Sequence, residues 1–292
     1  MSLDPVQRAR IHDTGVQAWE GSRRGVVAAV WTLAVHTVQR LLGLRRPFRS
    51  KIVPLVVLIT AYVPVLVFIG IAVVTPEELA RLFVMEGPAL LATLLAVTVL
   101  FVAVTGPETL CPDRRSGTLA LYLASPLSPA TYLAAKAAAL GVVLLLVTTG
   151  PPLLVELGYV LLGLGPDGVG ATVAGLVRPV IAGVVLSAFY TTLALAGSSL
   201  TDRRAYASVA LAALMLGSNA LVEIAIELLD VTPWLVLMAL LDGPTELAHR
   251  IYGESGDAPQ VPTGAVLAAV LAWIAAFGGL TWLRYRRGEV TR

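Results

Sequence analysis

The sequence predicts an all-α membrane protein that crosses the bilayer six times. Of its 292 residues, 57% are hydrophobic and only 14% are charged, and the mean hydropathy is +0.82. A soluble protein of this size has no interior large enough for so much apolar surface. Six stretches with few charges are long enough to span the hydrocarbon core. They are Val53–Val74, Pro88–Gly106, Ala137 to about Leu162, Leu176–Leu200, Tyr206 to about Leu229, and Gly264–Leu283.

The distribution of basic residues predicts that both termini are cytoplasmic. With this topology, Arg81, Arg178 and Arg250 are the only outer residues among the 21 Lys and Arg. Cytoplasmic loops of membrane proteins carry the excess of basic residues. Residues 1–24 are polar throughout, so we expect no signal peptide and an N-terminus that stays inside. The single cysteine, Cys111, excludes an internal disulfide framework.

Residues 26–44 precede the first span and predict an amphipathic helix. Polar residues recur there every three or four positions, which places them on one helix face. They are Thr32, His36, Gln39, Arg40 and Gly43. A helix with one wet side lies in the membrane interface and does not cross it. We therefore divide the chain into residues 1–52, which hold this interfacial elbow helix, and a six-span domain of residues 53–292.

The longest predicted cytoplasmic segment between spans is Pro107–Lys136. It opens with the acid–base cluster Glu108, Asp113, Arg114 and Arg115. After a hinge at Gly117, an apolar run makes about two helical turns, too few to cross a bilayer. Ser125-Pro126 ends this run, because the residue before a proline is disfavoured in a helix, and Ser128-Pro129 starts the next helix. Such a segment fits either a docking helix for a soluble partner or a solvated loop.

This segment resembles the loop between the second and third spans of bacterial ABC type 2 exporter permeases. In that family the loop has an acidic-basic-basic-x-Gly-Thr-Leu pattern, a short leucine-rich helix, a Pro-Leu-Ser turn and a lysine. The matching residues are Asp113, Arg114, Arg115, Gly117, Thr118, Leu119, Pro126, Leu127, Ser128 and Lys136. The resemblance implies that Gly117–Ser125 is a coupling helix seated in a cleft of a separate ATPase subunit. It implies ATPase contacts by the charged residues Asp113, Arg114 and Arg115, with Leu119, Tyr122 and Leu123 filling the cleft.

Two further segments resemble the same family. In the N-terminal segment the similar residues are His12, Asp13, Gly15, Trp19, Gly21 and Arg23. Between spans five and six, Thr232-Pro233 leads into WLVLMALL, which is apolar but too short to cross, and then into polar, proline-rich sequence. This pattern predicts a re-entrant or interfacial outer segment with Trp234 at headgroup depth.

Polar side chains within the spans are candidates for a substrate pathway or gate, because such groups are costly at bilayer depth. They are Asn219, Glu223 and Glu227 on span five, Glu156 on span three and Arg178 on span four. The spacing of four puts the first three on one helix face. Glu227 and Arg178 lie at similar heights and can pair if spans four and five pack side by side. Alternatively, Glu156, Glu223 and Glu227 are hydrated at the outer interface and mark the ends of spans.

The sequence has no signature of an enzyme. It has no Gly-x-Ser-x-Gly or His-Glu-x-x-His motif, and one cysteine cannot build a thiolate metal site. We expect no catalytic residue, metal or cofactor in this chain. Neither Lys51 nor Lys136 belongs to a phosphate-binding loop, so an ABC assignment requires ATP and Mg²⁺ in a separate ATPase subunit.

The favoured function is therefore the permease subunit of an ATP-driven ABC exporter in the bacterial cytoplasmic membrane. Its expected partners are an ATPase subunit, a second permease copy and the lipid bilayer, with no nucleic acid. One alternative is a secondary transporter that uses Glu156, Glu223 and Glu227 as proton or cation sites. Another is a membrane scaffold without transport.

Overall fold

The structure, a computed structural model, describes residues 25–44, 47–48, 51–80, 87–124 and 127–288, and in these ranges it contains helices and no strand. The elements are α1 (Val26–Leu41), α2 (Ile52–Val74), α3 (Glu77–Ala80), α4 (Gly87–Arg115), α5 (Thr118–Ala124), α6 (Pro129–Thr148), α7 (Gly150–Leu161), α8 (Val169–Leu200), α9 (Arg204–Glu227), the 3₁₀ helix η3 (Pro233–Met238), α10 (Asp242–Tyr252) and α11 (Thr263–Gly288). Six segments are long and apolar enough to cross a membrane, with α6 and α7 together forming one of them. The predicted all-α fold with six candidate spans is confirmed.

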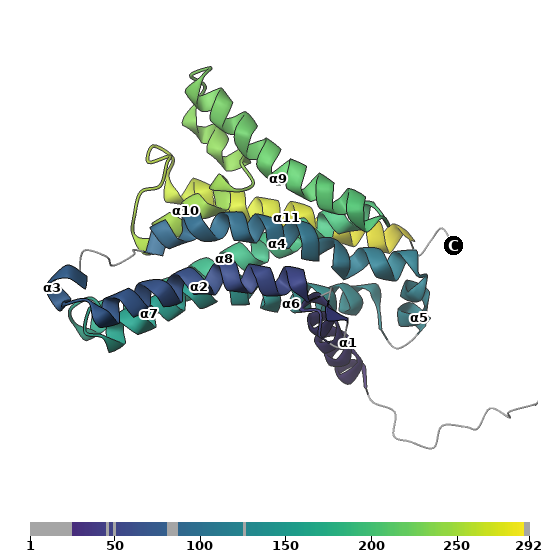
Figure 1. Cartoon of the computed structure of the whole chain (residues 1–292). Coiled ribbons are helices and arrows are strands. Elements are labelled where there is room, and N and C mark those ends of the chain that lie inside the picture. The colour runs from purple at the N-terminus through teal and green to yellow at the C-terminus, as the bar shows by residue number, and fades with distance from the viewer. Residues whose placement is uncertain (1–24, 45–46, 49–50, 81–86, 125–126, 289–292) are drawn as a thin grey trace, which may run out of the picture.

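The helices α4 and α8 form the centre of the bundle. α8 contacts α4, α6, α10 and α11, and α4 also contacts α2 and α9. Large side chains meet between them and are almost fully buried, among them Phe101, Phe189, Tyr190 and Leu193. α9 is different, because it leans away from α4 and α11 toward its end (Figure 1). In an apolar 18-residue stretch of each helix, only 11% of α9 is buried, against 72% of α4.

The third span is interrupted at Thr149, between α6 and α7, as its Gly-Pro-Pro sequence predicts. The two prolines carry no N–H and cannot continue the helical hydrogen-bond ladder. The hydroxyl of Tyr62 on α2 reaches this break and donates to the carbonyl of Leu146 at 2.6 Å. A Cβ atom at Gly150 would lie 1.9 Å from this hydroxyl oxygen, so the close approach of α2 requires glycine here.

Two helix boundaries differ from the prediction, and one is confirmed. α4 continues beyond Gly106 to Arg115, with Pro107 and Pro112 inside it, so the first part of the predicted loop is helical. α6 begins at Pro129, as the Ser128-Pro129 pair predicts, and the Ser128 side chain caps it by accepting from the Thr131 N–H. Lys136 consequently lies inside α6. α8 begins at Val169, seven residues before the predicted start of the span at Leu176.

The segment between α9 and α11 is also more helical than predicted. The apolar run forms η3, and the polar sequence after it forms α10, which packs against α8 and α11. The buried residues of α10 include Leu247, Ala248 and Tyr252 together with the charged Glu246. The sequence did not predict this helix. The re-entrant depth of the segment stays a prediction.

Candidate functional site

The candidate site lies at the end of the bundle that carries α5, where α4 ends. Gly117 has a φ of +70°, in the left-handed region that favours glycine, and this conformation turns the chain out of α4. The Thr118 hydroxyl donates to the carbonyl of Asp113 at 3.3 Å, and the Ser116 hydroxyl donates to the carbonyl of Pro112 at 2.7 Å. The Ser-Gly-Thr sequence therefore closes α4 and starts α5, the short helix expected here.

Asp113 lies inside the protein, with 3% of its surface exposed. Its Oδ1 atom accepts a hydrogen bond from Arg40 of α1 at 2.8 Å. Its Oδ2 atom lies 2.6 Å from Nζ of Lys136 on α6 and accepts from the hydroxyl of Tyr132 at 2.8 Å. One carboxylate thus joins α1, α4 and α6. We call Arg40, Asp113, Tyr132 and Lys136 the Asp113 cluster.

A proline in α4 helps to create the binding site for Arg40. Pro112 has no N–H, so the carbonyl of Glu108, four residues earlier, lacks its helical partner. The Arg40 guanidinium donates to this carbonyl at 2.6 Å and to the carbonyl of Thr109 at 3.0 Å. The prediction that Arg40 lies on the wet face of its helix is therefore wrong. Its side chain is 19% exposed and is turned toward α4.

The Asp113 cluster holds two cations and one carboxylate. Lys136, 1% exposed, is the more deeply buried cation. Its Nζ lies 5.4 Å from the ring centroid of Tyr132 and 6.0 Å from that of Tyr122. Aromatic faces attract cations, and this attraction supplements the ion pair. Tyr132 donates a further hydrogen bond to the Asp113 carboxylate, and Arg40 donates two to carbonyls of α4. These bonds offset part of the cost of burying charged groups in a low dielectric.

Tyr122 connects α5 to the Asp113 cluster. Its ring centroid lies 5.7 Å from that of Tyr132, which in turn lies 5.9 Å from that of Tyr285 on α11. Burial, assisted by the nearby charge of Asp113, raises the pKa of Tyr122, so its hydroxyl stays neutral. Three aromatic rings therefore link α5, α6 and α11, the first pair tilted and the second pair stacked.

The outward side of α5 presents Leu121, which is 72% exposed. Leu119 and Tyr122 are half-buried and pack against the protein's own core. The side chain of Leu123 lies outside the described residues. Of the leucine and tyrosine side chains described on α5, Leu121 is therefore the one most available to a partner, although the sequence favoured Leu119, Tyr122 and Leu123.

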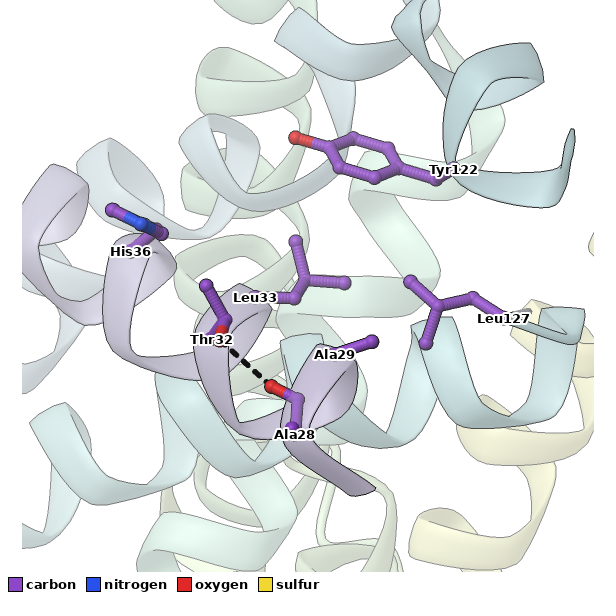
Figure 2. Close-up of a pocket in the computed structure, with 7 residues that line it drawn as sticks. All are labelled: Ala28, Ala29, Thr32, Leu33, His36, Tyr122 and Leu127. Carbon is purple, nitrogen blue, oxygen red and sulfur yellow. Dashed lines mark hydrogen bonds between the residues drawn. The ribbon is translucent and has the colours of Figure 1, made fainter. Parts of the chain in front are cut away.

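A cavity of about 370 Å³ separates α5 from α1 (Figure 2). Its lining residues are Ala28, Ala29, Thr32, Leu33, His36, Tyr122 and Leu127. The Thr32 hydroxyl donates to the carbonyl of Ala28 at 2.7 Å, within α1. The Thr32 hydroxyl is thus occupied within its own helix, and most of the other lining residues are apolar. α1 and α5 thus flank one hollow at the same end of the bundle.

Arg114 and Arg115 differ in their surroundings. The Arg114 guanidinium donates to the carbonyl of Ser199, near the end of α8. Close to it, the thiol of Cys111 donates to the carbonyl of Thr201 at 3.4 Å. Arg114 thereby helps to hold α4 against the end of α8, whereas Arg115 is exposed.

The candidate pathway residues on α9 do not act alike. Asn219 donates from Nδ2 to Oδ2 of Asp242 at 2.6 Å and accepts the Asp242 N–H on Oδ1 at 3.0 Å. It therefore anchors the start of α10 to α9. Burial raises the pKa of Asp242, although the hydrogen bond from Asn219 opposes this shift. Glu223 and Glu227 are exposed on the surface of α9.

The other two candidate pathway residues lie on different helices. The Glu156 carboxylate on α7 faces Gly175 of α8, where an added Cβ would lie 3.3 Å from Oε2. Arg178 is exposed, and its guanidinium faces Gly253 at the end of α10. Glu227, the last residue of α9, and Arg178 form no ion pair within the described residues. The C-terminal part of α9 leans away from the rest of the bundle (Figure 1). The structure therefore does not gather the five residues into one site.

An interaction that sequence reasoning missed holds the chain before α11. Arg250 lies 2.7 Å from Glu246, which is 3% exposed, and donates to the carbonyls of Ala258 and Val261 at 2.9 and 2.6 Å. The i,i+4 spacing of Glu246 and Arg250 was the available signal. Across the described ranges, no group of three or more His, Cys, Asp or Glu side chains is arranged to hold a metal.

The fold and the site define a multi-pass helical membrane protein with a short helix between its second and third spans. Residues 50–290 match the family model described as "ABC-2 family transporter protein". Because the match covers most of the chain, this protein belongs to the ABC-2 transporter family, as the coupling-loop residues indicated. A comparison with curated proteins gave no match.

Proposed function

We propose that this chain is the permease subunit of an ATP-driven exporter, and that a separate ATPase subunit hydrolyses ATP. Membership of the ABC-2 family and six apolar helices support the permease assignment. The observation that supports coupling is α5, a short helix between two spans that exposes Leu121 and contacts the buried Asp113 cluster through Tyr122. Two permease copies and two ATPase subunits form the working assembly in the bacterial cytoplasmic membrane. ATP and Mg²⁺ bind to the ATPase subunits.

In this proposal, α5 receives the movement of the ATPase and the Asp113 cluster distributes it. A displacement of α5 acts on Tyr122 and Tyr132, and through the shared Asp113 carboxylate on α1, α4 and α6 together. Separating these helices would leave buried charges unpaired, which costs several kcal/mol. They therefore move as one body between two membrane conformations that differ in affinity for cargo.

The predicted coupling residues divide into two groups in this mechanism. Leu121 is exposed and contacts the ATPase directly, together with Leu123 as the resemblance implies. Arg115, which is also exposed, is not needed for this contact. Asp113 and Arg114 act as positioning residues, because their charged groups are used within the chain. Gly117 and Thr118 set the angle between α4 and α5.

The direct test is replacement of Leu121 by aspartate. A charge at this exposed position disrupts an apolar contact with the ATPase but leaves the permease core unchanged, because Leu121 is 72% exposed. We expect the purified Leu121→Asp variant to lose its copurifying ATPase while keeping the wild-type unfolding temperature. Leu161→Asp is the matched control, since Leu161 is 85% exposed on α7, away from α5, and should retain the ATPase.

The same preparations discriminate the two transport mechanisms. An exporter of this class transports only with ATP and an intact ATPase subunit. Transport by the permease alone, driven by a proton gradient and abolished in Glu223→Gln, would instead establish the secondary-transporter alternative. Retention of the ATPase by Leu121→Asp would exclude α5 as its docking element.

A further inference from the structure

Arginines from two distant parts of the sequence meet at an open hollow beside the start of α9. Arg115 is the last residue of α4, and Arg203 and Arg204 immediately precede and begin α9. The hollow has a volume of about 910 Å³. Its other lining residues are Asp202, Ala205, Tyr206 and Ser208. The coupling mechanism assigns no role to this hollow.

The charges around the hollow do not cancel. Arg204 is paired with Glu108 of α4, its Nη2 lying 2.5 Å from Oε1. Asp202 is the one acidic residue of the lining, whereas Arg115 and Arg203 are exposed cations. Three arginines against two carboxylates leave one positive charge in excess. The hollow therefore favours an anionic ligand.

The position of the hollow relative to the spans indicates what kind of anion reaches it. It lies where α4 ends and α9 begins, on the side predicted to be cytoplasmic. Tyr206 is 61% exposed there, and the Arg203 guanidinium carbon lies 5.5 Å from its ring centroid. Exposed tyrosines beside arginines at a span end are typical of headgroup depth. Past Tyr206, α9 exposes Val209 and Leu216, so an amphiphile bound here finds an apolar surface for its chains.

We propose that this hollow binds the headgroup of an anionic phospholipid of the inner leaflet. Arg115 and Arg203 hold the phosphate, because planar guanidinium groups match phosphate oxygens. Tyr206 and Ala205 contact the glycerol region, and the acyl chains lie along α9. A volume of about 910 Å³ is within the usual range for small-ligand sites. Basic hollows between helix ends on the cytoplasmic side suit such lipids.

The test uses the full chain, purified in detergent, depleted of lipid and titrated with phosphatidylglycerol or phosphatidylcholine. Bound lipids are counted by native mass spectrometry. We expect phosphatidylglycerol to bind more tightly than phosphatidylcholine. The double substitution Arg115→Gln and Arg203→Gln should weaken phosphatidylglycerol binding about twenty-five-fold, at about fivefold per arginine. Arg204 is left in place so that its ion pair with Glu108 persists.

Two single variants make the test specific. Asp202→Asn removes the acid of the lining, so it should strengthen phosphatidylglycerol binding, by up to about fivefold. Arg178→Gln, which neutralises an exposed arginine on α8, should leave the binding unchanged. A decrease in affinity that is confined to the arginine double variant and a gain in Asp202→Asn together establish the site.

Several results would overturn the proposal. They are equal binding of the two lipids, unchanged affinity in the arginine double variant, no gain in Asp202→Asn, or an equal loss in Arg178→Gln. If the double variant retains phosphatidylglycerol but no longer copurifies with an ATPase, the hollow docks that subunit and the lipid proposal is wrong. Because the titration needs no ATPase subunit, its outcome is separate from that of the Leu121→Asp experiment.

Discussion

Replacement of Asp113 by asparagine should destabilise the protein strongly. The substitution keeps the size of the side chain but removes the charge that neutralises Arg40 and Lys136. Lys136 is 1% exposed. Breaking a buried ion pair by removing one partner typically costs about 3–5 kcal/mol, and we expect Asp113→Asn to fall in this range. Thermal unfolding of the purified chain in one detergent measures the loss.

The order of the single variants follows from their burial. Arg40→Ala should be milder, at about 1–3 kcal/mol, because Asp113 then keeps its ion pair with Lys136 and Arg40 itself is 19% exposed. Asp113→Asn combined with Lys136→Met removes both the carboxylate and the most buried cation. The double variant should therefore be more stable than the sum of the two single losses predicts.

A matched control separates the cluster from any general effect of removing a carboxylate. Asp167 is exposed in the connection between α7 and α8, and Asp167→Asn should change stability by less than about 0.5 kcal/mol. If Asp113→Asn unfolds at the wild-type temperature, or if the losses in the double variant are simply additive, the Asp113 cluster does not hold α1, α4 and α6 together.

Three further substitutions test other parts of the structure by thermal unfolding. Asn219→Ala leaves the backbone N–H and the carboxylate of Asp242 without their partner and should cost about 1–3 kcal/mol. Glu223→Gln, on the exposed surface of α9, should leave stability unchanged. Equal effects of the two substitutions would contradict an anchoring role for Asn219. Burial raises the pKa of Asp242, so the stability that this group contributes is complete below its ordinary pKa and is lost as the pH rises through the raised pKa. Asp242→Asn should flatten this dependence of stability on pH, and an unchanged profile would contradict the role of Asp242. Gly150→Ala places a methyl group 1.9 Å from the Tyr62 hydroxyl oxygen and should cost about 1–3 kcal/mol. This loss should shrink in a Tyr62→Phe background, and persistence of the full loss there would refute the steric cause.

The sequence was sufficient to predict the helices that cross the membrane, because long uncharged stretches and a basic excess are local properties. It also located α5 between Gly117 and the prolines that follow. It did not reveal that α4 continues to Arg115, because Pro107 and Pro112 suggest an early end to the helix. A donor from α1 stabilises the carbonyl that Pro112 leaves free. No local pattern encodes a contact across 68 residues of sequence.

The same limit applies to the candidate site. The acid–base motif drew attention to Asp113, but it suggested an exposed contact residue, whereas the carboxylate is shared by two buried cations. Lys136 was recognised only as a motif residue, and Arg40 was placed on the wrong face of its helix. On α9, the spacing of Asn219 and Glu223 identified a common face correctly, yet the partner of Asn219 lies on α10, a helix that the sequence did not predict.

The most direct test of the central claim is site-specific photocrosslinking from position 121 in intact cells. A photoreactive phenylalanine analogue there should crosslink to a protein that contains a phosphate-binding loop, because Leu121 is the exposed side chain through which α5 meets the ATPase in this account. The same analogue at Leu161 should not crosslink to that protein. Crosslinks from position 121 to lipid alone, or to proteins without a nucleotide-binding motif, would contradict the assignment of α5 as the coupling element.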